Sequence, residues 1–155
     1  MGWLRRSPKI IPAAQITPWD IDDVKRRLPE RINEDRLDHR LAPVHWEELA
    51  SEVGDRHCRE MLLNGYMAHW NLQGYKPYHR YSFAGGTNSV HENCSRMDST
   101  ADSIVTLDDV LSMALRCHES MMSERPPDDG HRRNILTLCT LMSVSAWITA
   151  IVGSA

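Results

Sequence analysis

The chain has 155 residues, of which 41% are hydrophobic and 25% are charged, and its net charge at pH 7 is −3. These values are typical of one globular domain and argue against a disordered chain. Because no face is clearly basic, the chain lacks the phosphate contacts that drive nucleic-acid binding, and we exclude nucleic acid as a partner.

The first 18 residues are predicted to be an irregular lead-in, since they contain three prolines. They include basic residues but no apolar run of the length that a secretory signal needs. Residues 18–41 predict two helical pieces, with Asp20 capping the first and Pro29 interrupting the pattern. Three residues mark the inward stripe of the second piece: Ile32, Arg36 and Leu37.

Residues 45–65 give the strongest helical pattern, which Asn64 and Gly65 should end. His57 lies on the apolar side of this helix and is interpreted as a hydrogen-bonded core histidine. The following stretch is rich in aromatic residues and glycine, and it predicts loops with short strands at Tyr78–Phe83 and Val90–Cys94.

A second clear helix is predicted over residues 106–124. Thr106 and Asp109 have the spacing of a capping box, and Pro126 and Pro127 end the helix. Its predicted buried stripe comprises Leu107, Val110, Leu111, Ala114, Cys117, His118 and Met121. The four cysteines form no CxxC pair, which excludes a zinc ribbon; two disulfides and four reduced thiols remain equally open, and the pairing cannot be assigned.

No local spacing matches a known catalytic motif, such as GxSxG, HExxH or a phosphate-binding loop. The candidates for chemistry are histidines and carboxylates in loops and at helix ends: His69, His91, Glu92, Glu119, Glu124 and His131. Two imidazoles and two carboxylates could bind zinc or a similar divalent ion, or act as a general acid and base. The alternative is that these side chains simply meet solvent.

Several short motifs follow one another along the chain: Asn33–Arg36, Pro43–Trp46, His57–Met61, His69, His91–Asn93, Glu124 and Gly130–Leu136. Their order resembles the CAP superfamily, which includes cysteine-rich secretory proteins, insect antigen 5, plant pathogenesis-related proteins and bacterial SCP-like domains. The box at His91–Asn93 departs from the family's G-E-N by having histidine in place of glycine. The resemblance covers about residues 30–136.

The resemblance implies an α+β fold, a three-layer α-β-α sandwich around a small, mostly antiparallel sheet. It also implies a cleft lined by His69, Glu92, Glu124 and His131, with Glu119 as the fallback for Glu124. Some family members bind a divalent metal such as zinc through the histidines, and others bind sterols or fatty acids elsewhere. An extracytoplasmic setting is also implied, although no signal peptide is visible.

After Leu136 the chain departs from the family pattern, and we divide it into a lead-in (1–29), a CAP/SCP-like domain (30–136) and an apolar tail (137–155). The tail has three interpretations: a membrane anchor, a buried helix or strand, or the product of a changed reading frame. We favour the changed frame, because one shifted translation restores a family-like strand. In that case the central sheet is expected to be incomplete, and the coding DNA decides the question.

The expected function is that of a binding or interaction module with a His/Glu cleft for a divalent metal. One alternative is a metal-dependent hydrolase or peptidase, in which Glu92 or Glu124 is the base while His69 and His131 hold the ion. The other is a carrier of lipid or sterol.

Overall fold

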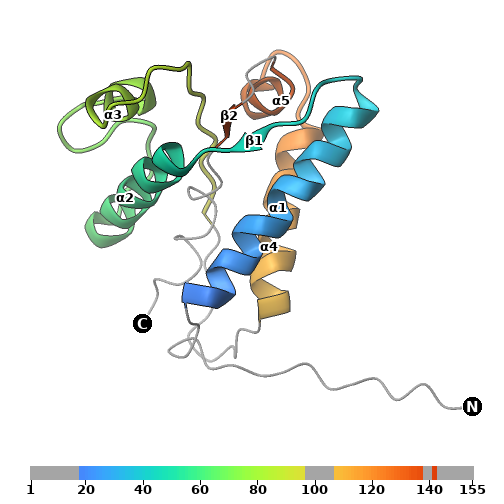
Figure 1. Ribbon diagram of the computed structural model, residues 1–155, viewed down its shortest axis with the longest axis horizontal. Helices are drawn as coiled ribbons and strands as arrows, with labels where there is room; N and C mark the ends of the chain where they lie inside the picture. Colours follow the sequence, from blue (N-terminus) through green and yellow to red (C-terminus); the bar gives the residue numbers. More distant parts are fainter. Residues whose placement is uncertain (1–17, 97–106, 138–140, 143–155) are drawn as a thin grey trace, which may run out of the picture.

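The computed structural model describes residues 18–96, 107–137 and 141–142. This part of the chain is predominantly helical. Its elements in chain order are α1 (Pro18–Asp38), β1 (His45–Trp46), α2 (Glu48–Asn64), α3 (Pro77–Phe83), α4 (Leu107–Ser123), α5 (Gly130–Ile135) and β2 (Leu141–Met142) (Figure 1).

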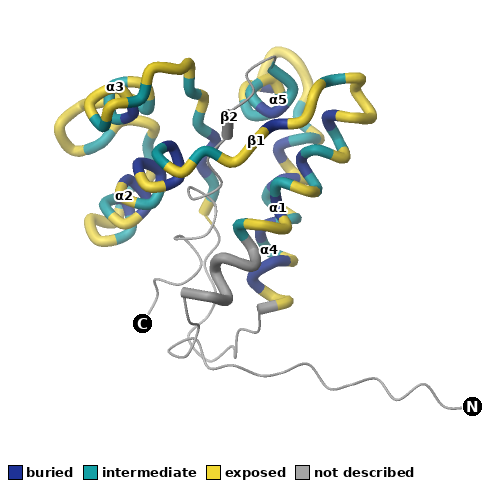
Figure 2. Tube along the Cα trace, in the orientation of Figure 1, coloured by how far each residue is buried: buried dark blue, intermediate teal, exposed yellow. Residues whose placement is uncertain are grey.

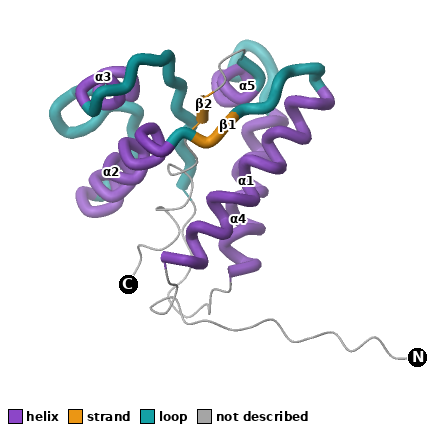
Figure 3. The backbone as a smooth tube through the Cα atoms, in the orientation of Figure 1, coloured by secondary structure: helices purple, strands orange, loops and turns teal. Residues whose placement is uncertain are grey.

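The helices form two groups with the two short strands between them. Helices α1 and α4 pack side by side, whereas α2 and α3 lie on the other side of β1 (Figures 1 and 3). The strands pair in parallel, with His45 opposite Leu141 and Trp46 opposite Met142. Within the described residues this pair is all the sheet there is, so the predicted, mostly antiparallel central sheet is not shown.

Helix α1 is continuous through Pro29, contrary to the predicted break. Proline removes one backbone hydrogen bond, but Leu28 and Ile32 on either side of it are fully buried and hold the helix against the core. The predicted stripe was right for Ile32 and Arg36 and wrong for Leu37, which is 73% exposed. Positions 28, 32 and 36 recur every four residues on one face, and position 37 turns away from it.

Helix α4 packs its apolar stripe against α1. The prediction is confirmed for Val110, Leu111, Ala114, His118 and Met121, which are buried. Cys117 is only half-buried, and the side chain of Leu107 lies outside the described part. His118 is fully buried, and its Nε2 lies 2.5 Å from a carboxylate oxygen of Asp35 on α1. The predicted Thr106 cap lies outside the described residues.

Helix α2 follows the prediction closely. It ends at Gly65, whose φ of 65° lies in the left-handed region, and the next amide, that of Tyr66, donates to the Met61 carbonyl. His57 is buried, and its Nε2 lies 2.8 Å from the Ala68 carbonyl oxygen, which confirms the prediction of a hydrogen-bonded core histidine.

The segment predicted as a strand at Tyr78–Phe83 is helical, and Val90–Cys94 contains no strand. Pro77 occupies the first turn of α3, where a missing amide hydrogen costs nothing. Tyr81 is the buried residue of this helix and the Arg80 side chain is also turned inward, while Tyr78, Ser82 and Phe83 are exposed. One of the aromatic residues that suggested a strand therefore makes an inward contact, and the others lie on an exposed surface.

Gly86 follows α3 and lies directly against the ring of Tyr81. A Cβ atom at this position would sit 2.2 Å from Cε1 of Tyr81, which is far inside van der Waals contact. We expect Gly86→Ala to lower the free energy of unfolding by about 1–3 kcal/mol, because the buried ring must shift. Urea denaturation measures the loss, and Gly130→Ala is the control, because a Cβ there meets nothing within 4 Å and the backbone is not left-handed. A loss in Gly86→Ala no larger than in Gly130→Ala would contradict the clash.

Two further observations concern expectations from the sequence. Among the described helices, none combines the length and apolar character needed to cross a bilayer. Cys94 and Cys117 are free thiols. Cys139 and most of the tail, to which the reading-frame hypothesis applies, lie outside the described residues. Within the tail, Leu141–Met142 forms β2.

Candidate functional site

An open pocket of about 620 Å³ brings together three of the four side chains predicted for the cleft. His69 comes from the loop between α2 and α3, Glu124 follows the end of α4, and His131 lies on α5. The fourth residue, Glu92, is not part of the lining but contacts His69 from behind. Three separate segments of the chain therefore converge on one cavity.

The first half of the site is a His69–Glu92 pair. Nδ1 of His69 lies 3.1 Å from Oε1 of Glu92. The Glu92 side chain is only 9% exposed, whereas that of His69 is 47% exposed. Since an ionised carboxylate can only accept, Nδ1 of His69 carries the hydrogen, and a neutral ring presents a lone pair at Nε2.

Arg80 on α3 fixes Glu92 from the other side. Its Nη2 lies 2.5 Å from Oε2 of Glu92, and its Nη1 donates to the carbonyl oxygens of His69 and Tyr75 at 2.9 Å. Burial alone would raise the pKa of Glu92, but the His69 hydrogen bond and the Arg80 charge outweigh it and lower that pKa. Glu92 is therefore ionised and anchored.

The second half of the site is a His131–Glu124 pair with the same chemistry. Nδ1 of His131 lies 2.5 Å from Oε1 of Glu124. The other oxygen of Glu124 accepts from the backbone amides of His131 at 3.0 Å and Arg132 at 3.3 Å. Desolvation opposes ionisation, but the His131 contact and these amides lower the pKa of Glu124.

Two asparagines connect the halves of the site. The side-chain amide of Asn93 donates to the His131 carbonyl at 3.1 Å. That of Asn134 donates to Oδ1 of Asn93 at 2.9 Å and to the Glu92 carbonyl at 3.4 Å. These hydrogen bonds thus fix the position of the loop that carries Glu92 relative to the helix that carries His131.

No protein-family model matches the chain, and comparisons with curated proteins and with solved structures give no match either. The function must therefore be argued from the site itself.

The remaining sequence candidates take different places. His91 lines the pocket and is exposed, whereas Glu119 is exposed on α4 and is not part of the lining. Sequence reasoning missed Arg80, Asn93 and Asn134 as supports of the site. The two asparagines fall inside motifs that were noted, but nothing in the sequence pattern marks Arg80.

The closest group of possible metal ligands in the described residues is His69, Glu92 and Cys94, whose donor atoms lie within 4.8 Å of one another. Glu92 is already engaged by His69 and Arg80. Burial, followed by the negative charge of Glu92, raises the pKa of the Cys94 thiol far above its usual range, so the thiolate that a metal needs is disfavoured. His69 and His131 line the same pocket, but among the described residues they do not belong to one such group of three ligands.

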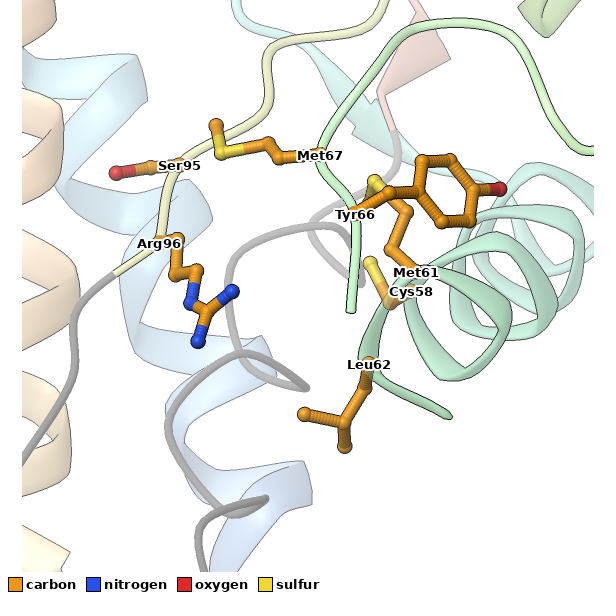
Figure 4. A pocket seen from close by; sticks show the side chains of 7 residues that line it. All are labelled: Cys58, Met61, Leu62, Tyr66, Met67, Ser95 and Arg96. Atoms are coloured by element: carbon orange, nitrogen blue, oxygen red, sulfur yellow. The ribbon is translucent and has the colours of Figure 1, made fainter. Parts of the chain in front are cut away.

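A second cavity lies between the end of α2 and the segment that carries Ser95 and Arg96 (Figure 4). Cys58, Met61 and Leu62 line it from the helix, opposite Ser95 and Arg96. Its volume of about 30 Å³ matches one water molecule. A fatty acid or a sterol does not fit into a space of this size.

Proposed function

We propose that this chain is an SCP/CAP-like binding or interaction module whose His/Glu cleft binds a divalent metal ion. The observation that carries the proposal is the repeated pairing: His69 and His131 line one pocket, and each is held through Nδ1 by a glutamate. Carboxylate–histidine–metal arrangements of this kind are usual in zinc sites.

The donor set is compatible with zinc. Neutral imidazole nitrogen is a preferred zinc ligand, and a site with few protein ligands leaves positions for water or a bound group. His69 and His131 would hold the ion, and the ion would act as a Lewis acid toward a ligand in the pocket. Glu92 and Glu124 keep the two rings in the tautomer that offers Nε2.

The finer fold and the setting belong to the same proposal. A three-layer sandwich is supported by the two helical groups on either side of β1 and β2. An extracytoplasmic location follows from the family resemblance and has no separate support.

Zinc titration by calorimetry tests the cleft. We expect His69→Ala and His131→Ala each to weaken zinc binding by more than about 100-fold, since loss of a supporting group alone costs about 10–100-fold. Glu124→Gln should fall in that lower range, because glutamine cannot hold His131 with a charge.

His45→Ala is the matched control, because His45 is an exposed histidine on β1 that does not line the pocket. Its zinc affinity should equal that of the unaltered chain. Unchanged zinc binding in both cleft variants, or an equal loss in the control, contradicts the proposed site.

No observation favours the hydrolase over the binding module. Every oxygen of Glu92 and of Glu124 already accepts a hydrogen bond, which opposes their use as a general base. Turnover of a peptide library that is lost in Glu124→Gln would instead support the enzyme. For the lipid-carrier alternative, the cavity at the end of α2 measures only about 30 Å³, and the pocket of about 460 Å³ between α1 and α2 is lined mainly by charged residues.

A further inference from the structure

The loop before α3 and the helix itself carry an exposed aromatic surface that the proposed function does not use. We define the aromatic patch as Trp70, Leu72, Tyr75, Tyr78 and Phe83, whose exposed fractions are 58%, 60%, 42%, 51% and 69%. Figure 2 shows exposed chain along this loop and much of α3. Large apolar side chains gathered in one exposed segment mark an interaction surface more often than chance.

The patch is held in shape by its own contacts. The Tyr75 and Phe83 rings lie 5.0 Å apart in an edge-on arrangement, and His79 stacks near Phe83. Asn71 closes the loop, since its Oδ1 accepts from the Tyr75 amide at 2.7 Å. The segment therefore presents its aromatic rings without having to be ordered first, which lowers the entropic cost of binding.

The charge of this segment differs from that of the chain as a whole. The chain has 21 acidic and 18 basic residues, yet residues 66–91 contain no Asp or Glu. Lys76 lies in the middle of the patch and is exposed. The acids that reach the segment are engaged: Glu60 accepts from the Leu72 amide and Glu92 pairs with Arg80.

We propose that the aromatic patch binds the surface of a lipid bilayer that contains anionic lipids, by inserting its rings and Leu72 at the headgroup level. Trp and Tyr prefer this depth because they combine an apolar body with a polar atom. An aliphatic residue such as Leu72 gains from the acyl region, and Lys76 gains from the negative surface. The contact is interfacial and requires no spanning helix.

Flotation of the full chain with vesicles tests this proposal. We expect the chain to float with vesicles of equal parts phosphatidylcholine and phosphatidylserine, and more weakly with phosphatidylcholine alone. Phe83→Ser and Trp70→Ser should each lower the partition coefficient by about tenfold, because each removes a large apolar contact. Lys76→Glu should remove the preference for the anionic vesicles.

Leu37→Ser is the matched control, since Leu37 is equally exposed but lies on α1 outside the patch, and it should float like the unaltered chain. A chain that stays unbound with both vesicles overturns the proposal. So does flotation that the patch variants leave unchanged, or a dimer in sedimentation analysis that Phe83→Ser dissociates, which would assign the patch to a second copy. Zinc titration of the same variants distinguishes a failure of the membrane proposal from a failure of the proposed metal site in the cleft.

Discussion

Replacing Arg36 with methionine should lower the free energy of unfolding by about 3 kcal/mol or more. The side chain is 1% exposed although it is charged. It donates to the Ala42 carbonyl at 2.8 Å, to the Ile135 carbonyl at 2.7 Å and to the Thr137 carbonyl at 2.8 Å. Methionine fills similar volume but leaves these acceptors without their donor, and each buried acceptor costs about 1–3 kcal/mol.

The effect is large because Arg36 joins segments that are far apart in the sequence. It connects α1 to the chain entering β1 and to the end of α5, which carries His131. Domains of this size are stable by about 5–15 kcal/mol, so the loss is a substantial part of the total. Zinc affinity should fall with it, because α5 loses its attachment to α1.

Urea denaturation measures the change, with Arg56→Met as the matched control. Arg56 is 69% exposed and pairs with Glu52 four residues away, an arrangement that contributes about 0.5 kcal/mol or less. Equal stability losses in the two variants would show that Arg36 does not hold these segments together. Arg36→Lys should recover only part of the loss, since an ammonium group cannot reproduce the planar guanidinium.

The long helices could be predicted from sequence because their signals are local. The recurrence of Ala50, Val53, His57 and Met61 predicts the buried face of α2, and Gly65 ends it. The same logic predicts the face of α4. The break at Pro29 was predicted wrongly because a local penalty of about 3 kcal/mol was outweighed by the burial of Leu28 and Ile32.

The region around α3 was predicted wrongly for a related reason. Tyr78–Phe83 is rich in residues that favour strands, but strand preference expresses packing against neighbouring strands, and no described strand adjoins this segment. Pro77 at the start and the inward side chains of Arg80 and Tyr81 suffice for a short helix. Local sequence does not reveal which neighbours are available.

The candidate site could likewise be predicted only in part from the sequence. His69, Glu124 and His131 could be named from motif order, and they line one pocket. The anchoring of Glu92 by Arg80 could not be foreseen, since the two residues lie twelve positions apart on different elements. Supports of this kind depend on tertiary geometry and leave no periodic pattern in the sequence.

The Glu92–Arg80 pair leads to the second prediction of large effect. We expect Glu92→Gln to lower the free energy of unfolding at neutral pH by about 3 kcal/mol, because it leaves a guanidinium that is only 9% exposed without its counter-charge. Glu52→Gln, at an exposed position of α2, is the matched control and should cost about 0.5 kcal/mol or less.

The difference between the unaltered chain and Glu92→Gln should depend on pH in a defined direction. Because folding lowers the pKa of Glu92, the folded state holds the ionised carboxylate more favourably than the unfolded state does. This contribution is complete above the ordinary glutamate pKa of about 4.3 and disappears as the pH falls through the folded value. Urea denaturation at a series of pH values should therefore show the two curves converging on acidification. A gap that stays constant down to the acid limit would mean that Glu92 stabilises the fold by its shape, and that its charge does not hold Arg80 and His69 in place.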